Sequence, residues 1–349
     1  RPRRHHRLST NIGSQNHSAV REANEPTLGA SAGSLGHRSL WWTWTAPSSG
    51  IYQLDTIGSE TPASEDGPAY PGRTIYGFDT RLAVYTGSAL GALTQVAFND
   101  SRTTESYGNS WIDFQRNSRL EFTATAGVTY TFLVNGENID TFSNPNQTNT
   151  GLIRLNFAKL QKPANDDFAN ATVITGHSHR ASTATFGATK ESGEPNHGGL
   201  TNGRTLWWRW TAPASGAYLV STAGNLYDDF HARRTGVGIY TGSAVNALTL
   251  VAQNQNGAGP NTGDSTWSLA QFTAVEGTTY HFAVDAAFAG NLVFILDRPP
   301  ANDAFANATV MQGSRWTAQG HNLGATYETN EPKIEAWFTP PPPPPHPPP

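Results

Sequence analysis

One stretch of this sequence occurs twice, and this repetition constrains the fold more than any other feature. Residues 163–195 open with Pro-Ala-Asn-Asp-Asp-Phe-Ala-Asn-Ala-Thr-Val and close with Gly-Ala-Thr-Lys-Glu-Ser-Gly-Glu-Pro. Residues 300–332 open with Pro-Ala-Asn-Asp-Ala-Phe-Ala-Asn-Ala-Thr-Val and close with Gly-Ala-Thr-Tyr-Glu-Thr-Asn-Glu-Pro. A period of this length indicates tandem structural units. The first copy opens a full unit, whereas the second opens a unit that the sequence does not complete.

A shorter third copy lies near the N-terminus. Residues 18–26, Ser-Ala-Val-Arg-Glu-Ala-Asn-Glu-Pro, match residues 187–195. In this alignment Arg3 stands at the position of Thr172, so the Asn-Asp-x-Phe-Ala-Asn-Ala element has no counterpart at the start of the chain. The sequence therefore predicts a repeat one that lacks its first element and a repeat two that is complete.

Two matching tryptophan-rich segments follow in the two repeats. They are Leu40-Trp-Trp-Thr-Trp-Thr-Ala-Pro47 and Leu206-Trp-Trp-Arg-Trp-Thr-Ala-Pro213. Side chains alternate between the two faces of a strand, so one face carries Trp42 and Trp44, and its counterpart carries Trp208 and Trp210. Tryptophans that alternate in a short strand favour a core over a sugar-stacking platform. We therefore expect these four rings to be buried.

The composition favours short strands over helices. The chain has 34 Gly and 23 Pro, and only 14% of its residues are charged. Matching Gly turns at Ala126-Gly127 and Glu276-Gly277 lead into segments with a period of two, as hairpins require. The net charge of −4 gives no basis for a nucleic-acid partner. The chain also lacks the run of about 18 apolar residues that a membrane-spanning helix needs.

These patterns divide the chain into four parts. Repeat one, without its first element, is expected at 1–160, and repeat two at 163–298. A partial third repeat follows at 299–338, and a polyproline II tail at 339–349. Residues 340–349 of this tail are all prolines except His346.

No motif for catalysis is present. The sequence has no nucleophile elbow, phosphate loop, Rossmann fingerprint or His pair at zinc spacing, so we expect neither an enzyme nor a required cofactor. Asp79, Asn99 and Asp100 are the candidate calcium ligands, because their side-chain oxygen atoms suit that cation. Repeat two has Arg234 and Asn254-Gln255 at these positions, and Asp and Asn in turns need no metal, so the sequence favours the absence of the ion.

With these motifs assembled, the chain resembles tandem β-sandwich repeats of secreted and surface bacterial proteins. Such repeats contain Asn-Asp-x-Phe-x-x-Ala, Gly-Ala-Thr-x-Glu-x-x-Glu-Pro, Trp-Trp-x-Trp-Thr-Ala-Pro and Phe-Asp-Thr-x-Leu-Ala-Val-Tyr-Thr-Gly. They are similar to pre-peptidase C-terminal and collagen-binding modules. The resemblance extends to about Phe338. It implies an all-β chain of two jelly-roll-like sandwiches outside the cell, with an adhesive, accessory or structural role and no catalytic activity.

Two functions of different kinds remain open from the sequence. One is a structural subunit of an extracellular bacterial filament, whose partners are copies of itself. The other is a glycan- or collagen-binding module of a larger secreted enzyme or adhesin. The mismatch of the repeats, with a surplus opening element behind a deficient first repeat, favours the filament.

The surplus element suggests how copies would join. Repeat one should expose a sheet edge and an apolar slot, and such an edge recruits another strand. We expect the segment Asn302–Val310, here called the donor segment, to complete repeat one of the next copy. Within it, Phe305, Ala308 and Val310 should fill the slot, and Asn302 or Asp303 should cap a helical turn. Short strands are expected at Thr309–Gln312 and Ala325–Glu328. Two alternatives are that the segment folds back on its own repeat one, or that the chain is a fragment of a longer array.

Overall fold

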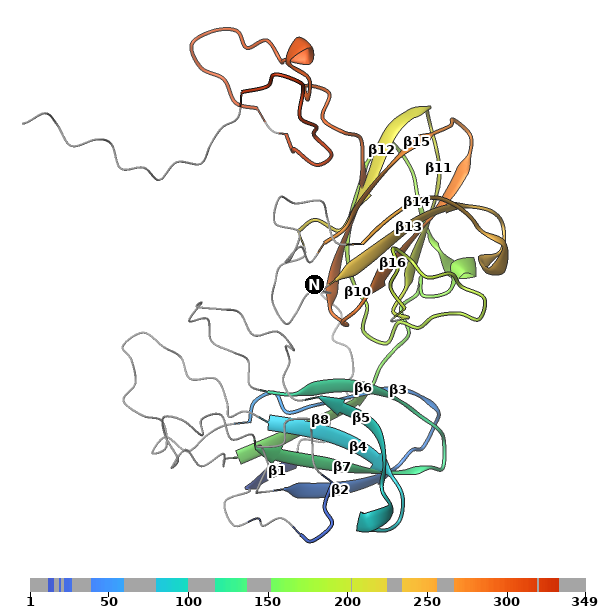
Figure 1. Ribbon diagram of the computed structural model, residues 1–349, viewed down its shortest axis with the longest axis vertical. Helices are drawn as coiled ribbons and strands as arrows, with labels where there is room; N and C mark the ends of the chain where they lie inside the picture. Colours follow the sequence, from blue (N-terminus) through green and yellow to red (C-terminus); the bar gives the residue numbers. More distant parts are fainter. Residues whose placement is uncertain are drawn as a thin grey trace, which may run out of the picture.

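The structure is a computed structural model, and it describes residues 12–15, 19, 22–26, 39–59, 80–99, 117–136, 152–201, 203–224, 234–255, 267–318 and 320–332. These residues form β-strands with four single turns of 3-10 helix, η1 to η4 (Figure 1). No helix among them is long and apolar enough to cross a membrane. The polyproline tail expected at 339–349 lies outside this described part.

The described residues of repeat one form eight strands in two antiparallel four-stranded sheets, with the orders β1-β8-β3-β6 and β2-β7-β4-β5. A short turn, η1, lies between β4 and β5. The strands and the turn are β1 (Ile12–Gln15), β2 (Leu40–Thr45), β3 (Gly50–Asp55), β4 (Thr80–Thr86), η1 (Leu90–Ala92), β5 (Thr94–Asn99), β6 (Arg119–Ala124), β7 (Thr129–Gly136) and β8 (Leu152–Lys159).

Repeat two contains the same eight strands and one more. Its sheets have the orders β10-β17-β12-β15 and β14-β13-β16-β11-β9, and the additional strand β9 runs parallel to β11. The elements are η2 (Phe168–Asn170), β9 (Thr172–Ile174), β10 (His179–Ala184), β11 (Leu206–Thr211), β12 (Gly216–Ser221), β13 (Thr235–Thr241), η3 (Val245–Ala247), β14 (Thr249–Gln255), β15 (Leu269–Ala274), β16 (Thr279–Ala286) and β17 (Asn291–Asp297).

When β9 is set aside, both repeats share one topology. Counting from one to eight in each repeat, the sheet orders are 1-8-3-6 and 2-7-4-5. This is the order of a jelly roll, in which two Greek keys form two facing sheets. The prediction of an all-β chain of jelly-roll-like sandwiches is therefore confirmed. The turns at Gly127 and Gly277, with φ of 79° and 75°, do not form the hairpins expected from the sequence, because β6 and β7, like β15 and β16, belong to different sheets and the turns connect those sheets.

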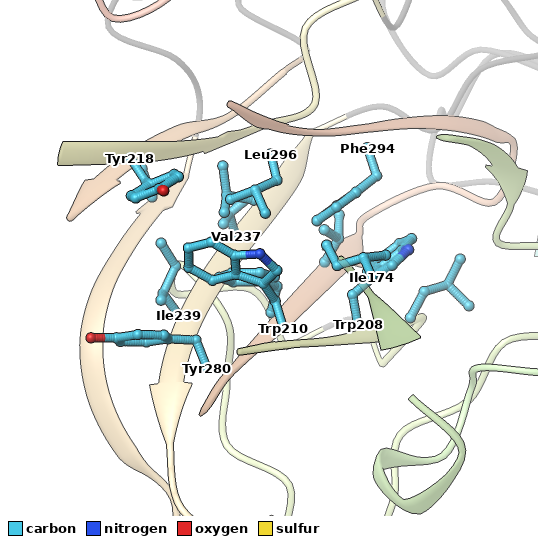
Figure 2. Packing of buried hydrophobic residues seen from close by; sticks show 14 of the residues in the cluster. Ile174, Trp208, Trp210, Tyr218, Val237, Ile239, Tyr280, Phe294 and Leu296 are labelled. Carbon is cyan, nitrogen blue, oxygen red and sulfur yellow. The ribbon is translucent and has the colours of Figure 1, made fainter. Parts of the chain in front are cut away.

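Tryptophans dominate the core of repeat two (Figure 2). Trp208 and Trp210 are 2% and 0% exposed, as predicted. The ring of Trp208 stacks on Phe294 with centroids 4.1 Å apart, and Trp210 Nε1 donates to the carbonyl oxygen of Gly176 at 2.9 Å. Each ring buries a large apolar area, and the indole N–H of Trp210 has a partner, which a buried polar group requires.

The corresponding rings of repeat one, Trp42 and Trp44, belong to the core as predicted, but they are buried only in part. Both pack against the core cluster but remain partly exposed. The reason is the missing neighbour of β2. In repeat two, β9 lies beside β11, and the turn after β9 supplies Gly176 to Trp210. No described residue takes that place in repeat one, where β2 ends its sheet.

The partial third repeat also differs from expectation. A single turn, η4, does form at Phe305–Asn307, but its N-cap residue is Ala304 and no side chain caps it. The strands expected at Thr309–Gln312 and Ala325–Glu328 are absent from the structure as described. A strand is defined by a hydrogen-bonded neighbour, and these segments have none in the single chain.

Candidate assembly site

The opening element of repeat two, residues 163–174, covers the outer edge of β11. Strand β9 pairs with Trp208–Trp210 in parallel. Just before it, Asn165 makes two hydrogen bonds with the main chain of Trp207. The N–H of Trp207 donates to the carbonyl oxygen of Asn165 at 2.8 Å, and Asn165 Nδ2 donates to the carbonyl oxygen of Trp207 at 3.0 Å. The edge of the sheet is thereby closed by the chain itself, which removes an unpaired row of backbone groups.

The apolar side chains of this element fill the space beside that edge. Phe168 contacts the ring of Trp207 edge-on, with centroids 5.1 Å apart, and lies 4.5 Å from the ring of His281. Under this cover Trp207 is 0% exposed. Along β9 the side chains alternate, so that Ile174 is 3% exposed and joins the core, whereas Val173 is 60% exposed. The element therefore has a defined inner and outer face.

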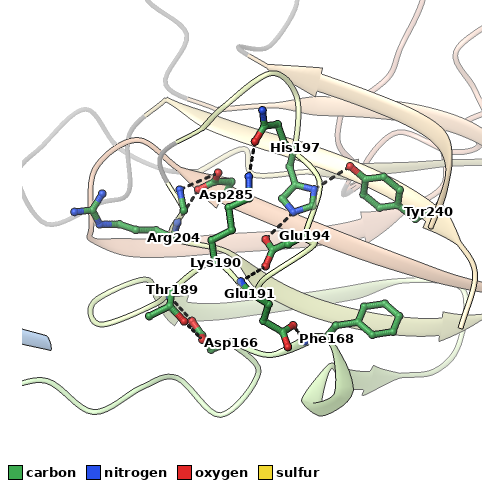
Figure 3. A network of polar contacts seen from close by, with 12 residues as sticks. Asp166, Phe168, Thr189, Lys190, Glu191, Glu194, His197, Arg204, Tyr240 and Asp285 are labelled. Atoms are coloured by element: carbon green, nitrogen blue, oxygen red, sulfur yellow. Dashed lines mark hydrogen bonds and ion pairs between the residues drawn. The ribbon is translucent and has the colours of Figure 1, made fainter. Parts of the chain in front are cut away.

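Two carboxylates hold the opening element in place (Figure 3). Asp166 accepts the backbone N–H of Thr189 at 2.5 Å and its hydroxyl at 2.6 Å. Glu191 accepts the N–H of Phe168 at 2.5 Å. Hydrogen bonds to an ionised acceptor are roughly twice as strong as neutral ones. The Gly-Ala-Thr-x-Glu motif therefore serves as a clamp for the Asn-Asp-x-Phe motif that precedes it.

A buried row of hydrogen-bonded side chains lies behind this clamp (Figure 3). Glu194 Oε1 lies 2.9 Å from His197 Nε2, and His197 Nδ1 lies 2.9 Å from the hydroxyl of Tyr240. Burial, together with the charge of Glu194, raises the pKa of Tyr240 to about 12. The hydroxyl of Tyr240 thus keeps its proton in ordinary buffers. These three side chains link the Glu-Pro turn to the sheet, and no nucleophile or metal is part of the row.

In repeat one the equivalent edge has no such cover among the described residues. Trp41, the counterpart of Trp207, is only partly buried, and its Nε1 donates to Glu25 Oε1 at 2.8 Å. The N–H of Glu22 donates to Glu25 Oε2 at 3.2 Å, so the Glu-Pro turn is formed. Tyr85 has a pKa raised to about 12 by burial and by Glu25, as Tyr240 does through Glu194. We call the outer edge of β2, with Trp41, Trp42 and Trp44, the acceptor surface.

The partial third repeat folds locally as the opening element of repeat two does. Asp303 accepts the N–H of Thr326 at 2.8 Å and its hydroxyl at 2.7 Å. Glu328 accepts the N–H of Phe305 at 2.7 Å. Yet Phe305 is 88% exposed and Met311 is 67% exposed. The clamp is thus present, but the sheet edge that its apolar residues cover in repeat two is not.

The partial third repeat also sits on repeat two much as repeat two sits on repeat one. Gln271 Nε2 on β15 donates to the carbonyl oxygen of Gly324 at 3.1 Å. At the matching position of repeat one, the carboxylate of Glu121 on β6 faces the backbone of Gly187, the counterpart of Gly324, which lowers the pKa of Glu121 and partly offsets the effect of burial. Both glycines have a positive φ, 73° for Gly187 and 72° for Gly324. The same two positions therefore meet at both joints, but Gln271 donates a hydrogen bond whereas a carboxylate can only accept one.

The residues predicted for the donor segment divide into two groups. By comparison with repeat two, Asn302, Asp303, Phe305 and Ala308 correspond to residues that contact the covered edge or its clamp. Val310 corresponds to Val173, whose side chain points outward, and the buried Ile174 corresponds to Met311. Met311, which directly follows the donor segment, is therefore a further residue that was not among those predicted to be buried. The alignment already paired it with Ile174, but only the structure shows which side of β9 is buried.

Of the three candidate calcium ligands, only Asn99 lies among the described residues. Asp79 and Asp100 lie outside the described residues, and Asn99 lies at the end of β5. Asn99 Oδ1 accepts the N–H of Arg119 at 3.4 Å, as its counterpart Asn254 accepts that of Leu269 at 3.2 Å. The described residues contain no group of three or more His, Cys, Asp or Glu placed to hold a metal. The absence of calcium stays a prediction.

A cavity of about 270 Å³ lies where the two repeats meet. Arg119 and Glu121 of repeat one line it, together with Arg204 of repeat two. Glu121 Oε2 lies 3.6 Å from Arg204 Nε, while Glu121 Oε1 and Arg119 Nε are buried without a hydrogen-bond partner. Burial raises the pKa of Glu121, and the nearby arginines partly oppose this.

Comparisons with known proteins identify no family. No family model and no curated protein matches the chain. Among solved structures, PNGase F, a glycosylasparaginase from Flavobacterium meningosepticum, is 13% identical over 83% of this chain and 96% of its own, with a TM-score of 0.21. The CBM32-1 and CBM32-2 domains of ZmpB from Clostridium perfringens are 9% identical over 74% and 80%, with a TM-score of 0.19. TM-scores this low carry no argument about function.

Proposed function

We propose that this protein is the structural subunit of an extracellular bacterial filament. Each copy would donate its partial third repeat to repeat one of the next copy, so that the subunits join head to tail. The role is structural rather than catalytic, and it requires no cofactor.

One observation carries this proposal. Among the described residues, the same element covers a sheet edge in repeat two, is not found on the equivalent edge of repeat one, and occurs again in the partial third repeat, where it covers no edge. Repeat two buries Trp207 completely beneath Phe168, whereas Trp41 of repeat one is partly exposed. Phe305, the second copy of that phenylalanine, is 88% exposed. Docking Phe305 on Trp41 would restore the contact that repeat two makes internally.

The repeated joint supports a periodic arrangement. Gly324 meets β15 of repeat two as Gly187 meets β6 of repeat one. If the next copy adds its repeat one to this segment, it would occupy the place of a third full repeat. The contact joins two different surfaces, so it propagates without limit unless the rotation closes a ring. A filament of jelly rolls in uniform succession is the expected product.

Truncation tests the proposal directly. A chain ending at Pro299 should stay monomeric in sedimentation velocity at concentrations where the full chain forms filaments visible by electron microscopy. Repeat two should still unfold cooperatively in this variant, because its own opening element is intact. Phe305→Asp in the full chain should act similarly, since assembly would bury an unpaired charge. Filaments of unchanged width from the truncated chain would refute the proposal.

Folding of the segment onto its own repeat one is the competing arrangement. It predicts a full chain that is monomeric at every concentration, with a Trp41 environment already altered relative to the truncated chain. Intrinsic tryptophan fluorescence at high dilution separates the two. A dilution-dependent change supports exchange between copies, whereas a dilution-independent difference supports closure within one copy.

Glycan or collagen binding is the second candidate, because of the cavity between the repeats. Arg119, Glu121 and Arg204 offer charged, partly unpaired groups there, and sugar hydroxyls or a peptide could use such groups. The resemblance to pre-peptidase C-terminal and collagen-binding modules fits this role too. The cavity volume of about 270 Å³ lies just below the range of about 300–1,000 Å³ that is usual for ligand pockets. Binding to a glycan array or to collagen that Arg204→Ala abolishes would support it, and the filament proposal does not predict such binding.

A further inference from the structure

We infer that Glu22 is the receiving carboxylate of the acceptor surface, and that the N–H of Phe305 passes from Glu328 of its own chain to Glu22 of the next copy during assembly. This inference rests on the proposed function and adds to it the residue that accepts the donor segment. It also assigns a holding role to the clamp of the partial third repeat before assembly.

Three copies of one turn in this chain provide the comparison. In each, the backbone N–H of the first glutamate donates to the carboxylate of the second, in the pairs Glu22–Glu25, Glu191–Glu194 and Glu328–Glu331. The distances are 3.2, 2.9 and 3.0 Å. The turn therefore presents the first carboxylate in the same way each time.

What differs is the partner of that first carboxylate. Glu191 accepts the N–H of Phe168 at 2.5 Å, and Glu328 accepts the N–H of Phe305 at 2.7 Å. Glu22 is exposed and its carboxylate has no hydrogen-bond partner in the described structure. Repeat one thus carries a formed acceptor, while none of its described residues supplies the phenylalanine N–H that would complete it.

The turn of repeat one also stands in its working position. Glu25 accepts the indole N–H of Trp41 at 2.8 Å, which ties the turn to the acceptor surface. A donor segment placed on β2 as residues 165–174 lie on β11 would bring the N–H of Phe305 to Glu22. That place cannot also be occupied by Glu328, because Glu22 and Glu328 correspond to the same residue, Glu191. The partial third repeat must therefore open its own clamp to dock in this way.

The exchange is not symmetric. Thr326 offers Asp303 both a backbone N–H and a hydroxyl, whereas the matching residue of repeat one is Val20, which has no hydroxyl. The clamp within one chain thus has one more hydrogen bond than the clamp between chains. The burial of Phe305, Ala308 and Met311 on the acceptor surface must outweigh that loss. This difference would keep the donor segment closed in the free chain.

The test uses full-length variants and measures the critical concentration for assembly by pelleting and electron microscopy. Glu22→Ala should raise the critical concentration about tenfold or more, since a hydrogen bond to a charged group is lost at each joint. Glu22→Gln, which keeps an amide oxygen as acceptor, should restore part of the assembly. Glu328→Ala is the matched control, and it should leave the critical concentration unchanged or lower it, because it only releases the donor segment.

The outcomes separate this inference from the proposed function. If Glu22→Ala assembles as the unaltered chain does, or if Glu328→Ala impairs assembly as strongly, the exchange is refuted although the filament stands. The second result would mean that the partial third repeat docks with its own clamp closed. If the unaltered full chain does not assemble at all, it is the proposed function that fails. Thermal unfolding of both variants below the critical concentration should match the unaltered chain, which excludes a folding defect.

Discussion

Replacing Met311 by alanine should weaken the association between copies, whereas replacing its neighbour Val310 should not. These adjacent residues correspond to Ile174 and Val173 of repeat two, which lie on opposite sides of β9. Ile174 is 3% exposed and Val173 is 60% exposed. Two neighbouring substitutions of similar size therefore carry opposite expectations, and only docking in the register of β9 produces this contrast.

The size of the effect follows from burial. Met311 is 67% exposed in the single chain, and docking would bring it to about the 3% of Ile174. Truncating a buried methionine to alanine costs about 2–5 kcal/mol, of which we take the lower end because the acceptor surface is an edge that can adjust. A cost of about 2 kcal/mol corresponds to a roughly 30-fold higher critical concentration. For Val310→Ala, as for surface substitutions generally, we expect about 0.5 kcal/mol at most, or roughly twofold.

Sedimentation and electron microscopy of the two full-length variants over a dilution series would measure these effects. Both side chains are exposed in the unassembled chain, so both variants should fold normally, and their thermal unfolding at high dilution provides the control. Equal effects of the two substitutions would refute the register and indicate general hydrophobic association. A larger effect of Val310→Ala would mean that the donor segment docks with its other face inward.

Three further predictions concern the separate repeats. Trp210→Phe should destabilise repeat two by about 1 kcal/mol more than Trp44→Phe destabilises repeat one in the unassembled chain, because only Trp210 donates a described indole hydrogen bond, to Gly176; denaturant unfolding would measure this. Burial, and secondarily the charge of Arg209, lowers the pKa of His281 in the folded chain. As the pH falls below about 6.5, the imidazole is therefore protonated first in the unfolded chain, and the stability that is present above this pH is lost. Replacing His281 by the threonine that repeat one has at this position should shrink the difference in Tm between about pH 7.5 and about pH 5, and an unchanged difference would contradict the reasoning. A chelator should leave the Tm of the full chain unchanged, and a decrease of many degrees would make the acidic residues around Asn99 the next to mutate.

Much of the fold could be predicted because it depends on local patterns. Alternation in the Leu-Trp-Trp-x-Trp-Thr segments indicated β2 and β11, and glycine marked the turns at Gly127 and Gly277, although these turns connect two sheets rather than close hairpins. The repeated motifs also identified the opening element of repeat two and its second copy. These features involve residues close in sequence, whose backbone preferences do not depend on the rest of the molecule.

The burial of the tryptophans could not be predicted in this way. The two Leu-Trp-Trp-x-Trp-Thr-Ala-Pro segments are nearly identical, yet Trp208 and Trp210 are buried while Trp42 and Trp44 are partly exposed. The difference lies in β9. Sequence alignment finds no counterpart of this strand in repeat one, but it does not reveal that β9 lies beside β11. Burial is a property of the neighbours that a strand acquires, and those neighbours come from distant parts of the chain.

The sequence by itself determined that the chain has two matching sets of strand segments and three Glu-x-x-Glu-Pro segments, with a surplus opening element towards its C-terminal end. Only the tertiary structure decided that the opening element of repeat two runs parallel to β11, that Met311 rather than Val310 matches its buried face, and that the carboxylate of Glu22 has no partner among the described residues. The physical reason is that the period of a strand fixes which residues share a face but not which face meets the core. That choice depends on the edge to which the strand binds.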